Sequence, residues 1–187
     1  MRILLIRHGM TEGNRQRRYI GVTDEPLCPE GIRQLEQTRV PFLPDRIYVS
    51  PMLRCVQTAQ ILFPEQELTA IRELREMDFG IFENRCWADD LEQDPRYLQW
   101  LDGRCEGQVP DGEGKAEFTR RCVEGFHKAL ALADGSPAAF VVHGGTIMSI
   151  LSEYAEDCRE YYSWNPANGH GYAAEWDGRM LKDVQEF

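Results

Sequence analysis

Three short apolar segments, each followed by a turn signal and then by a helical pattern, constrain the fold of this chain more than any other feature. They span residues 3–6, 47–49 and 139–142. Runs of this length that alternate with amphipathic helices are typical of strands in a parallel sheet with crossover helices. Two further segments, 171–176 and 180–184, flank an Asp-Gly pair and predict an antiparallel hairpin. We therefore predict an α/β fold, a three-layer α/β/α sandwich with a mainly parallel sheet and an antiparallel edge strand.

Capping residues and apolar spacing place helices between these strands. Ser50 followed by Pro51 predicts the N-cap and first position of the helix after the second strand. Pro29 opens a shorter helix, and residues 115–133 have the apolar spacing of a longer one. A further helix is expected to start at Gly144.

The length of 187 residues is that of one domain, and no linker or repeat divides it, so we predict a single domain over residues 1–187. Residues 73–114 fit the sheet pattern poorly, because glycine and proline interrupt them and twelve acidic residues stand there against four arginines. An excursion of this kind between a strand and a long helix is commonly a substrate-facing lid. We predict a lid-like insertion here, with a plain surface insertion as the alternative.

Charge and hydropathy limit the partners. The formal net charge of -10 would repel nucleic acid and anionic membranes, so neither is expected as a partner. The longest strictly apolar run, residues 138–142, is far shorter than a membrane span. The apolar stretch near the first residue is too short for a signal peptide. Six cysteines without a Cys-x-x-Cys pair predict reduced thiols, and we expect a cytoplasmic protein.

Basic residues gather in the N-terminal third, where residues 1–60 hold nine arginines against six acidic residues. This part of an otherwise acidic chain suits a small anionic ligand. Three of the arginines form a close run that we interpret as a solvated face, since most charge runs are: Arg15, Arg17 and Arg18.

Residues suited to phosphate chemistry stand where the predicted strands end. The first strand ends in Arg7-His8, the second leads to Arg54 in the first turn of its helix, and the third ends in His143-Gly144. Ligands of open α/β sheets bind beyond the carboxyl ends of the strands, so we expect these residues to converge. Arginine side chains and a helix N-terminus both match phosphate oxygens. The ligand implied is a phosphoryl group.

His8 is the natural nucleophile of such a site. An imidazole attacks phosphorus when one ring nitrogen is unprotonated and a hydrogen bond at the other fixes the tautomer. A leaving alkoxide also needs a proton, which we expect from a carboxyl group kept protonated by burial or by neighbouring negative charge. Residue chemistry leaves four candidates for this acid open: Glu73, Glu76, Asp78 and Glu83.

Four ordered motifs resemble the histidine phosphatase superfamily, in its phosphoglycerate mutase-like branch. They are Arg7-His8-Gly9, Ser50-Pro51-x-x-Arg54-x-x-Gln57-Thr58-Ala59, Leu74-Arg75-Glu76-Met77-Asp78-Phe79-Gly80, and His143-Gly144-Gly145. The match covers nearly the whole chain and implies a phosphoglycerate mutase-like fold. Within that branch, the stretch Pro110-Asp111-Gly112-Glu113-Gly114 that leads into Phe118-x-x-Arg121 is most similar to alpha-ribazole phosphatases of cobalamin synthesis.

The resemblance implies roles for individual residues. His8 would form a phosphohistidine, and Glu76 would donate the proton to the leaving group. Known members use no metal for the transfer, and no cofactor is expected. The residues that the resemblance implies for phosphate or substrate binding are Arg7, Asn14, Gly21, Arg54, His143 and Gly144.

The function predicted is therefore a metal-independent phosphomonoesterase that acts on a small phosphorylated metabolite, with alpha-ribazole 5'-phosphate as the leading substrate. A phosphoglycerate mutase-type enzyme or a broad-specificity sugar phosphate phosphatase is the first alternative. A phosphoprotein phosphatase or a phosphate-binding regulatory module is the second. Phe82-Glu83-Asn84 stands where relatives have Trp-Glu-Gly, which bears on the shape of the leaving-group pocket. A homodimer is compatible with each of these functions.

Overall fold

Six strands form one mixed sheet, in the order β3-β2-β4-β1-β5-β6, in the computed structural model, which describes residues 1–187. The first four strands in this order run parallel to one another. They are β3 (Leu68–Ala70), β2 (Arg46–Val49), β4 (Ala138–Val142) and β1 (Arg2–Arg7).

The predicted C-terminal hairpin supplies the antiparallel edge of the sheet. β5 (Gly171–Trp176) pairs antiparallel with β1, and β6 (Leu181–Glu186) pairs antiparallel with β5. The predicted α/β fold with a mainly parallel sheet is thus confirmed. The edge holds two antiparallel strands, both of them from the hairpin.

Both faces of the central strands are buried, because successive side chains of a strand point to opposite sides. Ile3 and Leu5 of β1 contribute to one apolar core, together with Phe140 of β4. Leu4 and Ile6 of the same strand contribute to the other core. The sheet therefore needs a helix layer on each side.

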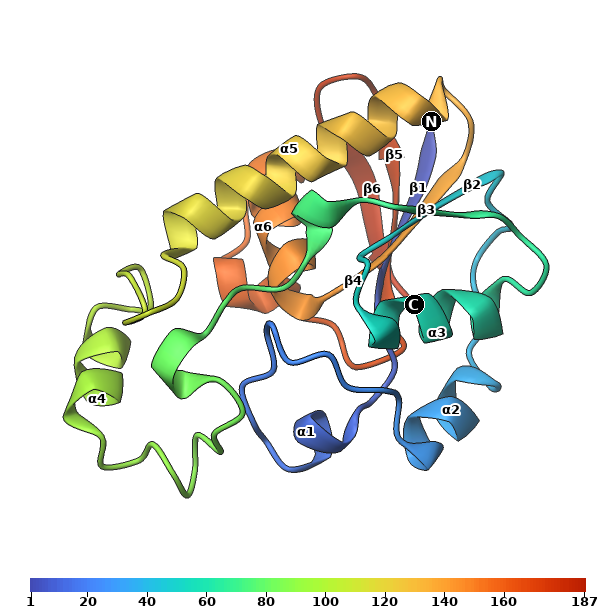
Figure 1. Ribbon diagram of the computed structural model, residues 1–187. Helices are drawn as coiled ribbons and strands as arrows, with labels where there is room; N and C mark the ends of the chain where they lie inside the picture. Colours follow the sequence, from blue (N-terminus) through green and yellow to red (C-terminus); the bar gives the residue numbers. More distant parts are fainter.

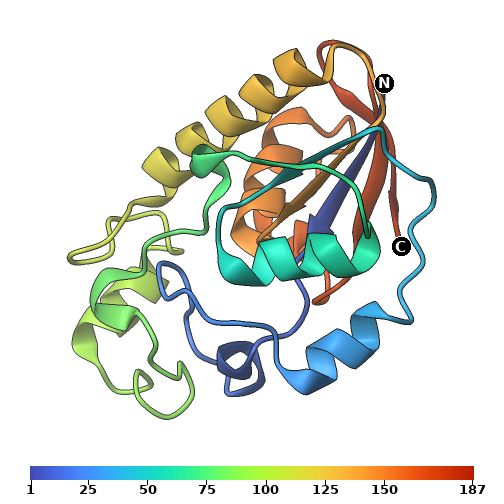
Figure 2. The ribbon, with the colours of Figure 1, turned by 45° about the vertical axis from the view of Figure 1, so that its right-hand side comes forward.

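Those two layers are visible in Figures 1 and 2. α5 (Lys115–Ala133) and α6 (Gly144–Tyr154) cover one face, and α3 (Leu53–Leu62) covers the other, with α2 (Pro29–Leu35) packed beside it. α5 spans the range predicted for it and is followed by Asp134, whose left-handed backbone, with φ 47°, ends the helix. The helix predicted from Gly144 is also confirmed.

The helix after β2 begins later than predicted. Ser50 and Pro51 lie in a turn, and α3 begins only at Leu53. The cap comes from a distant loop, because the Leu53 N–H donates to Oδ1 of Asp24 at 2.7 Å. The Ser50 hydroxyl instead lies 2.7 Å from Nε2 of His143. A residue that the sequence pattern assigns to a helix cap thus belongs to the candidate site.

Several short elements lie in the connections. Propensity reasoning does not identify them, because each is only three to eight residues long or irregular. Besides β3, they are α1 (Glu12–Arg15), the 3-10 helices η1 (Arg72–Leu74), η2 (Gly80–Phe82) and η3 (Tyr161–Trp164), and α4 (Pro95–Asp102).

Residues 73–114 build a small unit around an apolar cluster that they share with α5. This unit, with η2 and α4, lies beyond the carboxyl ends of the parallel strands, next to the loop that carries α1 (Figure 1). Two members of the cluster, Phe118 and Cys122, belong to α5 and attach the unit to the main body. The other buried members are Met77, Phe82, Leu91, Tyr97, Trp100 and Val109. Closure of this unit as a lid stays a prediction.

All six cysteines are free thiols. One of them has a local structural role, because Sγ of Cys28 accepts a hydrogen bond from the Gly31 N–H at 3.4 Å and so caps α2. No helix combines the length and the apolar character that crossing a membrane requires.

Candidate active site

The predicted site residues come together where the parallel strands end. His8 follows β1 directly, and His143 follows the neighbouring parallel strand β4. Arg54 lies in the first turn of α3. The loop after β1 is fixed to that helix, because the Gly9 N–H donates to the Thr58 hydroxyl at 2.9 Å. Three segments that are far apart in the sequence therefore converge, as their positions at strand ends predict.

His8 presents one unprotonated ring nitrogen. Its side chain is buried, and Nδ1 lies 2.7 Å from the carbonyl oxygen of Gly9. Because a carbonyl oxygen only accepts, Nδ1 carries the ring proton and Nε2 keeps its lone pair. Burial, together with the charges of Arg54 and Arg7, holds the pKa of His8 well below its ordinary value. A neutral imidazole with a fixed tautomer is the state that a nucleophile requires.

Arg54 and His143 form a fully buried layer beneath His8. The two imidazole rings meet edge-on, with their centroids 5.2 Å apart. Nε of Arg54 donates to Nδ1 of His143 at 3.3 Å, so the ring proton of His143 lies on Nε2 and points to the Ser50 hydroxyl. Neither Arg54 nor His143 lines the cavity described below. Their predicted direct contact with phosphate stays a prediction.

The other donors of Arg54 hold the loop that contains Gly21. NH1 donates to the Thr23 carbonyl at 2.8 Å, and NH2 donates to the Gly21 carbonyl at 3.0 Å. A Cβ at Gly21 would lie 1.8 Å from the carbonyl oxygen of Met77, so only glycine lets these two segments pack so closely. Gly21 thus lies behind Arg54 and outside the cavity lining. Its predicted substrate contact stays a prediction.

Arg7 reaches the site from the end of β1. NH1 donates to the Pro166 carbonyl at 2.7 Å and to Oδ1 of Asn165 at 3.1 Å. Nε of Arg7 is buried and has no hydrogen-bond partner within the protein. Such a donor is costly to leave unpaired, and a guanidinium group pairs best with an anion. Arg7 therefore suits the anionic ligand that the sequence pattern predicts.

Glu76 is half-buried, and backbone groups hold both of its carboxylate oxygens. The Met77 N–H donates to Oε1 at 2.9 Å, and the Gly145 N–H donates to Oε2 at 3.2 Å. Burial raises the pKa of Glu76 above its ordinary value, against the opposing effects of these hydrogen bonds and of Arg54 and Arg7. A carboxyl group that keeps its proton nearer neutrality is suited to protonate a leaving oxygen.

Of the four carboxylates that residue chemistry leaves open, only Glu76 lines the cavity. Glu73 pairs with Lys128 at 3.2 Å, and Asp78 accepts from the Gly80 N–H. Glu83 accepts the backbone N–H groups of residues 21 and 23. These carboxylates are dispersed, and no group of three or more His, Cys, Asp or Glu side chains is arranged to hold a metal ion.

Asn14 and Gly144 complete the wall around His8, and both line the cavity. Oδ1 of Asn14 accepts from the Thr11 N–H at 3.2 Å and from Nδ2 of Asn168 at 3.1 Å. Because its oxygen is engaged, Asn14 has its own Nδ2 left as a donor. Gly144 opens α6, where backbone N–H groups lack intrahelical acceptors. The binding roles of both residues stay predictions.

A cavity of about 280 Å³ extends from His8 to the insertion. Sequence reasoning does not identify Lys115 and Asn165, which line it without belonging to a recognisable motif. Arg18 is exposed, in agreement with its interpretation as part of a solvated face. It also lines the cavity and donates to Oδ1 of Asn84 on the insertion at 3.2 Å. The aromatic side chains of the wall are Tyr19, Phe79, Trp100, Phe118, Tyr161 and Tyr162.

Comparison with known sequences agrees with the motifs. The family model described as histidine phosphatase superfamily (branch 1) matches residues 3–182. A protein from Proteus mirabilis (strain HI4320), named "Probable phosphoglycerate mutase GpmB", is 34% identical over 158 residues. The match covers 81% of this chain and 74% of that protein.

Solved structures with two different names share the fold. The alpha-ribazole phosphatase from Shigella flexneri matches with a TM-score of 0.82 at 26% identity, over 97% of this chain and 93% of that one. The phosphoglycerate mutase from Thermus thermophilus matches with a TM-score of 0.73 at 31% identity, over 98% of both chains. These likenesses agree on the family and differ on the reaction. The chain is an enzyme that belongs to the histidine phosphatase superfamily, branch 1.

Proposed function

We propose that the chain is a metal-independent phosphomonoesterase that works through a phosphohistidine at His8 and takes alpha-ribazole 5'-phosphate, in cobalamin nucleotide-loop synthesis, as its substrate. The observation that carries the chemistry is the neutral His8, with Nδ1 bound to the Gly9 carbonyl and Nε2 left unprotonated beside the cavity. We place the reaction in the cytoplasm, in keeping with the six free cysteines.

The proposed cycle has two displacements at phosphorus. Nε2 of His8 attacks the phosphoryl group, a P–N bond forms, and the P–O bond to the leaving group breaks while Glu76 gives its proton to the leaving oxygen. The Glu76 carboxylate then takes a proton from water, whose oxygen attacks phosphorus and breaks the P–N bond. Both steps use the same carboxyl group in its two protonation states.

The phosphoryl oxygens need donors throughout this cycle. Arg7, Nδ2 of Asn14 and the N-terminus of α6 at Gly144 face the cavity and supply them. We include Arg54 and His143 as the layer beneath, on the strength of their position under His8. Because guanidinium groups would neutralise the charge of the phosphoryl group without a metal ion, we expect turnover to persist when EDTA chelates metals.

The wall of the cavity supports a bulky aromatic leaving group. Beyond the polar groups around His8, six aromatic side chains line a space of about 280 Å³. Aromatic rings stabilise a flat heterocycle by stacking and by burial of apolar surface. The benzimidazole nucleoside of alpha-ribazole offers such a ring, whereas glycerate does not.

A phosphoglycerate mutase-type activity is the second candidate, because two further cations line the cavity. Lys115 and Arg18 both belong to its wall. Lys115 already pairs with Glu106 at 2.5 Å, whereas Arg18 bonds the neutral side chain of Asn84 and therefore suits the carboxylate of a glycerate better. The name of the Proteus mirabilis relative points to the same alternative. Transfer to a second substrate would, however, require that water be kept from the phosphohistidine.

A panel of phosphorylated metabolites tests the proposal, with wild type and His8→Ala assayed side by side in EDTA. We expect alpha-ribazole 5'-phosphate to have the highest kcat/KM and label on the enzyme to be lost to water. Transfer of the label to added 3-phosphoglycerate would establish the mutase instead. Slow turnover of every small ester, with fast turnover or tight binding of phosphopeptides, would move the function to the phosphoprotein class.

A further inference from the structure

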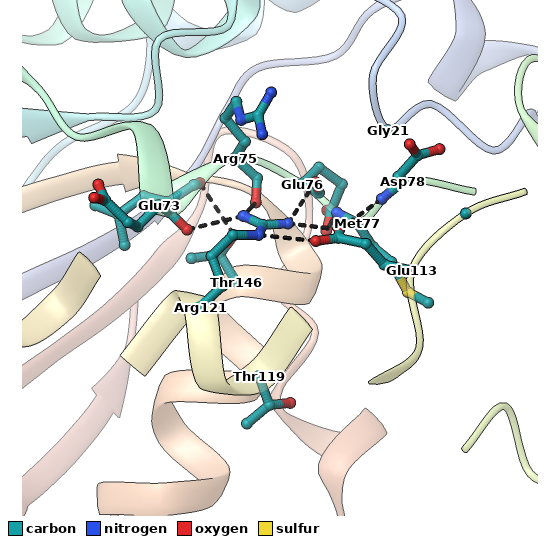
Figure 3. Close-up of polar contacts among 12 residues, drawn as sticks. Gly21, Glu73, Arg75, Glu76, Met77, Asp78, Glu113, Thr119, Arg121 and Thr146 are labelled. Atoms are coloured by element: carbon teal, nitrogen blue, oxygen red, sulfur yellow. Dashed lines mark hydrogen bonds and ion pairs between the residues drawn. The ribbon is translucent and has the colours of Figure 1, made fainter. Parts of the chain in front are cut away.

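The geometry points to Arg121 as a positioning residue for Glu76, acting from α5 and held in turn by Glu113. Arg121 does not line the cavity around His8, so it acts on the reaction only through another group. The inference rests on the proposed role of Glu76 as the proton donor. Figure 3 shows the polar contacts of Arg121, Glu113 and the Glu76 segment.

The backbone that carries Glu76 has no regular structure to fix it. η1 ends at Leu74, and residues 75–79 lie in neither a helix nor a strand. Arg121 takes the place of a hydrogen-bonding ladder. NH1 donates to the carbonyls of Glu73 and Arg75, each at 2.9 Å, and NH2 donates to the carbonyl of Glu76 at 3.2 Å (Figure 3).

Arg121 has no freedom to turn away from these carbonyls. Its remaining donors engage Glu113 at both ends, with Nε bound to Oε1 at 2.9 Å and NH2 bound to Oε2 at 2.6 Å. All five N–H groups of the guanidinium are thus used. The two side chains are only 18% and 19% exposed, so water competes weakly for them.

Glu113 also fixes the far side of the Glu76 segment. Its Oε2 accepts the Asp78 N–H at 2.9 Å, and its own N–H donates to the Asp78 carbonyl at 2.9 Å. The pair of Arg121 and Glu113 therefore holds the chain on both sides of the acid. Thr146 of α6 binds the intervening Leu74 carbonyl at 3.3 Å.

The carboxylate of Glu76 must be positioned accurately. Its two oxygens depend on the Met77 and Gly145 N–H groups, and a Cβ at Gly145 would lie only 2.3 Å from Oε1. A shift of the backbone by about 1 Å would separate the carboxyl from these donors and from the leaving oxygen, and misplacement of that size costs about 10²-fold in rate. Arg121 is the residue that prevents it.

The test compares Arg121→Met with Arg120→Met, which makes the same chemical change at the adjacent exposed residue of α5. Two substrates are used: an alkyl phosphate, whose leaving oxygen needs a proton, and para-nitrophenyl phosphate, whose phenolate leaves without one. kcat/KM is measured because it reports the steps up to phosphorylation of His8. We expect Arg121→Met to lose at least about tenfold on the alkyl ester and less than about threefold on the aryl ester. Arg120→Met should change neither.

Two further variants separate the possible failures. Glu113→Gln keeps the shape of the pair and weakens its hold, so it should show the same selective loss to a smaller extent even if Arg121→Met does not fold. Glu76→Gln sets the full size of the effect. The positioning role would be overturned by the following result: Glu76→Gln loses activity mainly on the alkyl ester, whereas the Arg121 and Glu113 variants lose the same on both esters or lose nothing. No selectivity in Glu76→Gln itself would instead overturn the proposed acid.

Discussion

His8 and Glu76 are two neighbouring groups whose pKa values are shifted in opposite directions by their surroundings. Burial and two arginines lower the pKa of the imidazole, while burial raises that of the carboxyl. Each shift favours the neutral form, which is the state that an imidazole needs to act as a nucleophile and a carboxyl group needs to donate a proton. Opposed shifts in one site are a sign of an acid and a nucleophile that work together.

The pH dependence of the reaction follows from these two signs. Because the pKa of His8 is lowered, the imidazole stays neutral as the pH falls through about 6.5, the ordinary imidazole value. Because the pKa of Glu76 is raised, the carboxyl keeps its proton above the usual carboxyl range and loses it as the pH rises further. We predict that kcat/KM for an alkyl phosphate persists below about pH 6.5. It should decline as the pH rises and the Glu76 carboxyl loses its proton.

The same pH series with para-nitrophenyl phosphate is the matched control, since its leaving group needs no proton. It should lack the alkaline decline that Glu76 causes. Identical alkaline limbs for the two esters, or activity lost as soon as the pH falls through about 6.5, would contradict the assignment.

Residues at strand ends could be predicted from sequence, whereas most of the cavity wall could not. Arg7, His8 and His143 follow apolar runs directly, so the topology alone brings them together. Lys115 and Asn165 reach the same cavity from a helix start and from a loop, and no pattern in the sequence marks them. Their place depends on long-range packing, which neither spacing nor composition encodes.

Among the elements, α6 follows β4 of the sheet, and its N-terminus contacts Glu76, the proposed acid. Gly145 lies in its first turn and donates its N–H to Glu76. We predict that Gly145→Ala lowers kcat/KM for alkyl phosphates at least about tenfold, because the added Cβ would stand 2.3 Å from Oε1 of Glu76 and displace it. The same Cβ would lie 3.0 Å from the buried ring of Phe118, so we also expect a lower melting temperature, which calorimetry measures separately from the kinetics.

Gly107→Ala is the control for Gly145→Ala, because a Cβ at Gly107 would meet no atom within 4 Å. Calorimetry measures the melting temperature of both variants, and kinetics with an alkyl phosphate measure their kcat/KM. If Gly145→Ala keeps full activity, the carboxyl of Glu76 does not need its present position.

Element boundaries show where local signals suffice. α5 and β5 span the predicted ranges, since each has a clear apolar period and a turn at its end. α3 begins later than Ser50-Pro51 suggests, because Asp24 from a distant loop caps it. The short β3 is held by its pairing with β2, and α1 is a single turn held by the capping box of Thr11 and Asn14, so neither has an apolar period of its own. Local chemistry thus predicts long elements and misses those that depend on distant partners.

At the scale of the whole molecule, residues 73–114 are joined to the main body through a shared apolar cluster. Phe82 of this segment is fully buried in the cluster with Phe118 of α5. The proposed acid Glu76 lies in this segment and the proposed nucleophile His8 follows β1, so the proposed reaction requires that both parts stay together. The acidic composition of the segment predicts a separate excursion, and the shared cluster is the reason why we expect the segment and the sheet to form one domain.

Phe82→Ala tests whether residues 73–114 and the sheet unfold as one domain. We predict a loss of about 3–5 kcal/mol in the free energy of unfolding, as is usual for a buried phenylalanine. Urea transitions followed by far-UV circular dichroism and by tryptophan fluorescence should remain coincident, because the segment and the sheet unfold together. Trp87→Ala, which removes an exposed aromatic from the same segment, should cost far less. Two separate transitions would show that the segment is an independent unit.

Formation of a phosphohistidine at His8 is the step on which the proposed reaction depends. The direct measurement is rapid mixing with a labelled phosphomonoester, a quench that preserves P–N bonds, and mass spectrometry to locate the phosphoryl group. We predict label on His8 alone, longer-lived label in Glu76→Gln with an aryl ester, and a loss of at least about 10³-fold in kcat for His8→Ala. Full turnover with no phosphorylated enzyme, or with the phosphoryl group on another residue, would contradict the proposed mechanism.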